Sequence, residues 1–145
     1  YINRTYRVLP TAFAVTLANI AHTLYNHFMW TVIVDEPAVP EIRSLPEDLK
    51  ARLLQVIDMI VTDGPHDPPP NLVRHVEGKL WELRLKARSG IARALYFTVD
   101  PRRVVILSAF VKKTQKLPSS ELERARTRMQ RRQESEPAGK KGKTK

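Results

Sequence analysis

Hydrophobic and polar positions follow a regular pattern through the first half of the chain. The segment Trp30–Asp35 is rich in β-branched residues and predicts a short strand. A short helix is expected over Pro37–Leu45, since proline is tolerated in a first turn. A longer helix is expected over residues 46 to about 62, because apolar residues recur at helical spacing after an acidic first turn.

The second half alternates between strand-like segments and turns. Asp63–Asn71 contains four prolines and a glycine, so it predicts a loop. A last helix is expected from Glu121 to about Arg132, with Ser120 as its N-cap and Glu123 completing a capping box. Short connections favour an antiparallel meander. Its four predicted strands are residues 72–77, 79–87, 91–99 and 104–111.

This order of elements predicts an α+β fold, with two N-terminal helices packed on an antiparallel β-sheet and a C-terminal helix. We expect the domain to span residues 29–133, followed by a basic disordered tail over 134–145. Residues 1–28 are interpreted as an N-terminal extension. Their apolar run is shorter than the roughly 20 residues of a membrane span. A helical extension, a signal peptide and a start at Met29 are the open interpretations.

Strand phase separates basic from apolar side chains. Trp81 shares one face of its strand with two leucines and is expected in the core, whereas Glu82, Arg84 and Lys86 share the face expected to meet solvent. On the next strand, Arg93 and Tyr96 lie in opposite phase, so they share a face only if a bulge intervenes. Arg84, Arg93 and the lysines that follow the last strand come from neighbouring strands and could converge; these lysines are Lys112, Lys113 and Lys116.

Charge is distributed unevenly along the chain. The formal net charge is +10, but residues 1–78 hold 6 basic and 9 acidic residues (net −3), while residues 79–145 hold 19 and 6 (net +13). This asymmetry is typical of a surface that binds a polyanion. The chain has no cysteine, which excludes disulfides and thiol chemistry. Its four histidines lack the spacing of metal ligands, so no metal site is predicted.

Three segments together resemble a known family. They are LPEDLKARLLQVIDMI, RHVEGKLWELRLKARSGIARALYF and VVILSAFVKKTQKLPSSELERARTRM. The chain is similar over residues 29–133 to toxins of the RelE/ParE superfamily, and more narrowly to the HigB-type, phage-derived Gp49-like branch. The resemblance implies the toxin of a type II toxin–antitoxin system, a ribosome-dependent endoribonuclease that cuts mRNA in the bacterial cytoplasm without metal or cofactor. The implied partner is a helix-turn-helix (HigA-like) antitoxin, through which alone operator DNA would be bound.

Metal-free cleavage of RNA needs a proton acceptor for the 2′-hydroxyl, a cation for the phosphate and a proton donor for the leaving oxygen. A guanidinium binds phosphate through two nitrogens, and a lysine beside other cations has a lowered pKa. The resemblance and this chemistry assign catalysis to Arg84, Arg93, Lys113 and Tyr96. They assign RNA binding to Lys79, Lys86, Arg88, Lys112 and Lys116.

The chain departs from the family pattern at three positions. Ala92 and Ser108 stand where an aromatic residue and a histidine are frequent, and Leu117 replaces a frequent threonine. Two alternatives therefore accompany the nuclease. One is a ParE-like, gyrase-inhibiting toxin, which does not need a convergent basic site. The other is a catalytically weak RNA-binding remnant, favoured by the first two departures.

Overall fold

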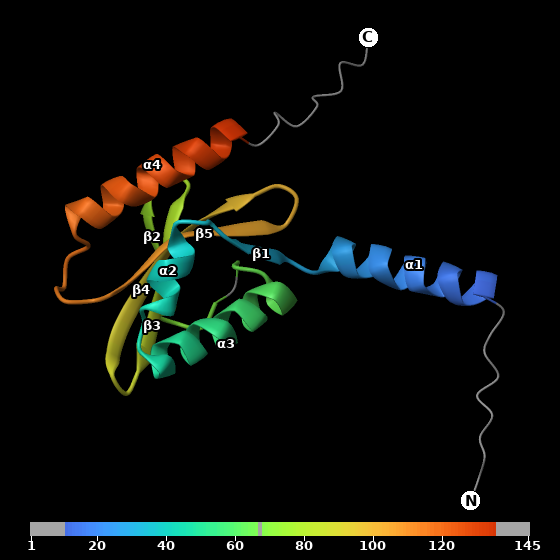
Figure 1. Cartoon of the computed structure of the whole chain (residues 1–145), viewed down its shortest axis with the longest axis horizontal. Helices are drawn as coiled ribbons and strands as arrows, with labels where there is room; N and C mark the ends of the chain where they lie inside the picture. Colours follow the sequence, from blue (N-terminus) through green and yellow to red (C-terminus); the bar gives the residue numbers. More distant parts are fainter. Residues whose placement is uncertain (1–10, 67, 136–145) are drawn as a thin grey trace, which may run out of the picture.

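The computed structural model describes residues 11–66 and 68–135 of the chain. Within them, a five-stranded sheet has the strand order β1-β5-β4-β3-β2, and four helices accompany it (Figure 1). The strands are β1 (Thr31–Val34), β2 (Val73–Glu77), β3 (Leu80–Ala87), β4 (Gly90–Val99) and β5 (Arg103–Val111). The helices are α1 (Thr11–Phe28), α2 (Ala38–Arg43), α3 (Glu47–Asp63) and α4 (Ser119–Ser135).

The predicted α+β fold is confirmed, and the predicted strands and helices match the observed ones to within a few residues. One pairing differs from the prediction. Strand β1 pairs with β5 in parallel, whereas every other neighbouring pair is antiparallel. Parallel strands need a long crossover connection, and everything between β1 and β5 in the chain supplies it. The sheet is therefore mixed.

Helices α3 and α4 lie on opposite sides of the sheet (Figure 1). Leu53 and Val56 of α3 pack against one face, together with Leu83 of β3. Ala125 of α4 packs against the other face, together with Phe97 of β4. The sequence predicted cover only from the two N-terminal helices, so the second core beneath α4 is an addition to the expected architecture.

Strand β3 shows what this second core changes. Arg84 and Lys86 are exposed, as predicted. The prediction that Trp81 is in the core and Glu82 faces solvent is wrong, because Trp81 is 36% exposed and Glu82 only 5%. Glu82 and its neighbour in phase, Leu80, are buried on the α4 side of the sheet. Trp81 lies on the α3 side, but beside the loop that follows α3.

Ion pairs fasten α4 to both edges of the sheet. Asp35, buried just after β1, accepts hydrogen bonds of 2.7 Å from Arg131 and from Arg132. At the opposite edge, Arg126 pairs with Glu77 at the end of β2. These arginines belong to the basic half of the chain, yet their charges are balanced locally. The net charge of that half therefore overstates the cationic surface that is free to bind a polyanion.

The ends of α4 differ from the prediction. The helix already includes Ser119, so Ser120 lies within its first turn and is not the N-cap. The carbonyl of Pro118 accepts hydrogen bonds of 3.1 Å from the N–H groups of Glu121 and Leu122. The helix continues to Ser135, two residues into the predicted tail. Residues 136–145 of that tail, like residues 1–10 of the predicted extension, lie outside the described residues.

A β-bulge interrupts the pairing of β4 with β5. Leu95 pairs with Ser108, but Tyr96 pairs with Ile106, which leaves Leu107 without a partner residue. Strand β1 ends at this level, so the outer edge of β5 is no longer covered by a strand.

An ion pair between α2 and α4 covers this uncovered edge. Arg128 of α4 donates a hydrogen bond of 2.8 Å to the carbonyl of Leu107 and pairs with Glu41 of α2. Glu41 in turn accepts a hydrogen bond of 3.3 Å from the N–H of Ala109. The backbone groups that β1 does not reach are therefore satisfied by side chains.

Helix α1 projects away from the sheet (Figure 1). Several of its apolar side chains are exposed, from 46% for Leu17 to 62% for Phe28. Arg102, in the turn before β5, donates a hydrogen bond to the carbonyl of His27 near the end of this helix. Among the described residues, no helix is both long and apolar enough to cross a membrane. The predicted domain boundaries stay predictions.

Candidate nucleic-acid interface

Arg84 of β3 and Arg93 of β4 are directly opposite each other in the strand register. Opposed residues of an antiparallel pair project from the same face, with Cβ atoms about 5 Å apart. The two arginines border a cavity of about 260 Å³, which we call the basic pocket. Besides them, the pocket is lined by Asn71, Val73, Arg74, Glu82, Lys112 and Gln115.

Arg93 is the fixed member of the arginine pair. Its side chain is 4% exposed, and its Nε lies 3.4 Å from Oε1 of the equally buried Glu82. Its Nη2 donates a hydrogen bond of 2.7 Å to the carbonyl of Gln115, in the segment after β5. Arg93 therefore holds the floor of the pocket and the loop above it together. Arg84 is exposed and no ion pair is recorded for it, so its guanidinium is available to a phosphate.

Lys112 enters the pocket from the end of β5. Its N–H donates to the carbonyl of Ile91 at 2.7 Å, and its Nζ donates to Oε1 of Gln115 at 3.1 Å. Loss of hydration lowers the pKa of the Lys112 ammonium, and the positive charges of Arg84 and Arg93 lower it further. Glu82 acts in the opposite direction. A lysine with a lowered pKa can transfer a proton more readily than an ordinary one.

The loop before β2 closes one side of the basic pocket. Leu72, buried at its end, accepts a hydrogen bond of 2.7 Å from the N–H of Arg84. Asn71, with a φ of 66°, lies in the left-handed region that asparagine tolerates better than most residues. Arg74 of β2 pairs in register with Glu82. Sequence reasoning missed Asn71 and Arg74, because only the register of β2 against β3 brings them to this site.

Glu82 is the most informative residue that the sequence left outside the predicted site. It shares the phase of Arg84 along β3, which placed both residues on one face in the sequence analysis but did not assign Glu82 to the site. We expected that face to meet solvent, so its burial was not foreseen. Its carboxylate is the one acidic group lining the basic pocket among the described residues.

Tyr96 does not join this site. Strand β4 pairs regularly with β3, so Tyr96 and Arg93 project from opposite faces, and the bulge lies in β5 instead. Tyr96 is 1% exposed in the core beneath α3, and burial raises its pKa to about 12. Tyr96 therefore lies outside the basic pocket, and its catalytic role stays a prediction.

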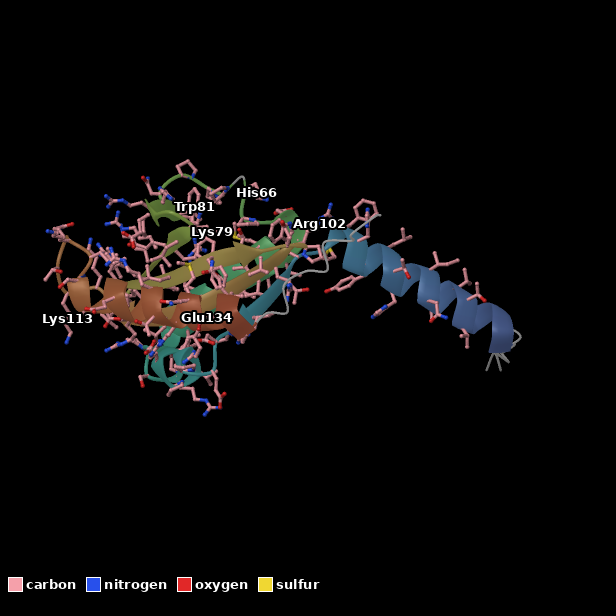
Figure 2. The ribbon with its side chains drawn as sticks, turned by 90° about the horizontal axis from the view of Figure 1, so that it is seen from above. His66, Lys79, Trp81, Arg102, Lys113 and Glu134 are labelled. Atoms are coloured by element: carbon pink, nitrogen blue, oxygen red, sulfur yellow. The ribbon has the colours of Figure 1, made fainter. Side chains whose placement is uncertain are left out.

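Among the predicted lysines and Arg88, Lys112 alone is found in the lining of the basic pocket within the described residues. Lys112 lines the basic pocket, but Lys113 does not and is exposed at one end of the molecule (Figure 2). The other predicted RNA-binding residues, all exposed and outside the pocket lining, are Lys79, Lys86, Arg88 and Lys116. Their role in binding stays a prediction.

The departures from the family pattern are buried. Ala92 is fully buried beneath α3, on the face opposite Arg93. Ser108 is also fully buried, and its Oγ has no hydrogen-bond partner among the described residues. Neither position lines the basic pocket. In the described part of the chain, no three histidine or acidic side chains gather in a way that could hold a metal ion.

The fold and this pocket define a small α+β domain with a cationic site on its sheet. Residues 40–130 match the family described as "Phage derived protein Gp49-like (DUF891)", and the chain belongs to this family. This match confirms the predicted Gp49-like branch, and the structural likeness below confirms the predicted RelE-like fold.

Two solved structures are similar to the chain. One is a mutant of the toxin RelE from E. coli in the free state, with a TM-score of 0.50 and 17% identity, covering 70% of this chain and 98% of that one. The other is the archaeal RelE–RelB complex from Pyrococcus horikoshii OT3, with a TM-score of 0.44 and 23% identity, covering 59% of this chain and 97% of that one. The first supports a RelE-like fold. No curated protein matches the chain.

Proposed function

We propose that this protein is the toxin of a type II toxin–antitoxin pair and that it cleaves mRNA on the ribosome without a metal ion. Membership of the Gp49-like family and the RelE-like fold support the toxin class. The basic pocket carries the nuclease part of the proposal, because Arg84, Arg93, Lys112 and Glu82 meet around one cavity. These side chains supply the cation, proton acceptor and proton donor that RNA cleavage needs.

The proposed reaction is an attack of the ribose 2′-oxygen on the adjacent phosphorus. The new O2′–P bond forms as the P–O5′ bond breaks, leaving a 2′,3′-cyclic phosphate and a 5′-hydroxyl. Arg84 binds the phosphate oxygens, since its guanidinium is exposed and matches phosphate geometry. Glu82 accepts the 2′-hydroxyl proton, and Lys112 donates a proton to the leaving oxygen. Arg93 positions Glu82 through their buried contact.

The partners of the proposed toxin follow from its class. We propose a helix-turn-helix antitoxin of HigA type, which would bind operator DNA for the pair, and the ribosome, which would present mRNA to the basic pocket. The bacterial cytoplasm is the proposed compartment. The uneven charge of the chain supports an RNA partner, with net +13 over residues 79–145.

The test is to induce the 145-residue chain in bacteria and map RNA 5′ ends genome-wide. Growth arrest with new 5′ ends inside translated mRNAs is expected. Arg84→Ala should relieve both effects, because it removes the exposed phosphate ligand. Arg52→Ala is the matched control, since Arg52 lies on α3, does not line the basic pocket, and donates a hydrogen bond to Gln55 on the same helix. Intact transcripts with DNA damage would instead favour the gyrase-inhibiting alternative.

Purified protein with programmed ribosomes gives the second readout. Cleavage there should persist in a chelator selective for transition metals, which leaves the Mg²⁺ that ribosomes need, as expected for chemistry carried by side chains. RNA binding without cleavage by the unaltered chain would support the catalytically weak remnant and overturn the nuclease proposal.

A further inference from the structure

A second cavity, which we call the aromatic pocket, lies across the sheet from the basic pocket. Its volume is about 290 Å³, and it lies between the loop after α3 and strands β2 to β4. Trp81 and Tyr96, directly opposite each other in the register of β3 and β4, form part of its wall. His66 and Thr98 add polar groups to its lining.

Trp81 is held as a platform within this pocket. The His75 ring lies edge-on to it, with centroids 4.8 Å apart and an interplanar angle of 62°. His75 is itself fixed, because its Nε2 donates a hydrogen bond of 2.8 Å to the carbonyl of Gly78. With 36% of its surface exposed, Trp81 offers ring area to a ligand from a fixed position. A large aromatic side chain that is half-buried in this way is common where ligands bind.

The two pockets meet at one residue of an edge strand. Val73 of β2 lines both the basic and the aromatic pocket. Strand β2 is the last strand of the sheet, so no further strand in the described residues separates the two faces. A chain that leaves the basic pocket can therefore pass over β2 at Val73 and reach Trp81. Lys79, exposed and two residues before Trp81 in the chain, adds positive charge near this route (Figure 2).

We propose that the aromatic pocket binds a nucleobase of the same RNA strand whose phosphate occupies the basic pocket, stacked on Trp81. This inference rests on the proposed function, because it takes the strand from that site. Every base has a flat π-face that an aromatic side chain can stack on. The Thr98 hydroxyl and the His66 imidazole are polar groups of the lining that can face the edges of that base. The cationic pocket next to it favours a polyanion over a peptide as the occupant.

Intrinsic fluorescence tests the stacking directly, because the chain has only two tryptophans. Trp30→Phe leaves Trp81 as the sole reporter in the full-length protein. The probe is a single-stranded 2′-O-methyl hexaribonucleotide at low salt, which lacks the nucleophile and stays intact. Saturable quenching is expected. Binding by Trp81→Ala, which lacks this reporter, is measured from the fluorescence anisotropy of a dye-labelled oligomer and should be about tenfold weaker, as for loss of one stacked base. Trp81→Phe should retain most of the affinity.

Two comparisons separate this inference from the proposed function. If Arg84→Ala loses RNA binding while Trp81→Ala keeps the affinity of the unaltered protein, the phosphate site stands and the stacking proposal is overturned. An Arg84→Ala protein that binds RNA as well as the unaltered one would overturn the proposed function itself. Equal quenching by an oligomer with abasic sites would mean that the fluorescence change reports charge alone. Quenching by the antitoxin but not by RNA would mean that the pocket binds protein. Either result overturns the inference. Circular dichroism of each variant checks that it is folded.

Discussion

Glu82 and Arg93 form a buried ion pair in the floor of the basic pocket, with Oε1 and Nε 3.4 Å apart and side chains 6% and 4% exposed. Breaking a buried pair from one side costs about 3–5 kcal/mol, because it leaves a charge without compensation. Arg93→Ala should therefore lower the free energy of unfolding by about that amount in urea titrations. An apolar double variant, Glu82→Leu with Arg93→Met, should recover most of the loss. Equal instability of the single and double variants would contradict this account.

Glu82 is also the proposed proton acceptor, and a second variant tests this role separately from its ion pair. Glu82→Gln keeps the shape of the side chain but cannot accept a proton at neutral pH. Cleavage on ribosomes should fall by about 100-fold or more, the usual contribution of a general base. RNA affinity should change little, because Arg84 still binds phosphate. A parallel fall of affinity and rate would assign Glu82 to positioning instead.

Lys112 and Lys113 are adjacent in sequence but differ in the structure, since only Lys112 lines the basic pocket. We therefore expect Lys112→Met to reduce the cleavage rate by about 100-fold, as for loss of a general acid. Lys113→Met, of the same size and charge change, should affect salt-dependent binding alone. Single-turnover rates on ribosomes measure the difference. A larger loss in the Lys113 variant would restore the original prediction from sequence.

The pH profile gives an independent check on Lys112. Its pKa is lowered from 10.5, first by loss of hydration and then by Arg84 and Arg93. A general acid works in its protonated form, so activity should decline as pH rises through this lowered pKa. Arg84→Gln removes one of the charges that lower the pKa. The residual activity of that variant should therefore decline at a higher pH than that of the unaltered protein. A profile that moves to lower pH would exclude Lys112 as the acid.

Asp48 ties the β3–β4 turn to the start of α3. It accepts hydrogen bonds from the N–H of Ser89, at 2.8 Å, and from the Ser89 hydroxyl. The Ser89 hydroxyl, followed by its N–H, lowers the pKa of Asp48 below 3.8. A lowered folded-state pKa contributes stability that is full above pH 3.8 and is lost as the pH falls through the folded-state value.

Asp48→Asn should therefore lower the melting temperature at pH 7 and shrink the further loss on acidification. Thermal melts between pH 7 and 2.5 measure both effects. Asp58→Asn, an exposed carboxylate on the same helix, is the control and should leave the profile nearly unchanged. If the melting temperature of the Asp48 variant falls with acidification as steeply as that of the unaltered protein, the lowered pKa of Asp48 does not contribute to stability.

Replacing the buried Ser108 by an apolar residue of similar size should increase the stability of the fold. Its Oγ is buried and has no hydrogen-bond partner among the described residues. A buried polar group without a partner costs about 1–3 kcal/mol. Ser108→Ala should therefore raise the free energy of unfolding, by about 1 kcal/mol, in urea titrations. Thr127→Ala, on the exposed surface of α4, is a comparison without burial. A loss of stability in the Ser108 variant would mean that the hydroxyl is satisfied in solution.

Most of the fold could be predicted from local pattern, because strands and helices here carry clear period-two and helical spacing. The alternation along β3 placed Arg84 and Lys86 on its exposed side. Because Arg84, Arg93 and Lys112 come from neighbouring strands, the sequence also predicted that they could converge, and all three line the basic pocket. Those inferences needed only alternation along a strand and the order of hairpins.

The remaining features depend on contacts between distant segments. Glu82 is buried against Arg93 of the neighbouring strand, on the face of the sheet where α4 packs, and the highly charged sequence of that helix does not indicate this second core. The parallel pairing of β1 with β5 joins residues about 70 positions apart, and no local pattern encodes it. The register of β2 against β3 likewise brings Asn71 and Arg74 to the basic pocket.

The contacts of Glu41 and Arg128 along β5 also make the two edges of the sheet unequal. On that side, side chains occupy the backbone groups of Leu107 and Ala109 that another strand would need. At the other edge, β2 has a strand neighbour on one side only. A further strand therefore cannot pair with β5 beyond the end of β1, whereas β2, the edge strand at which both pockets meet, has no strand neighbour on its outer side.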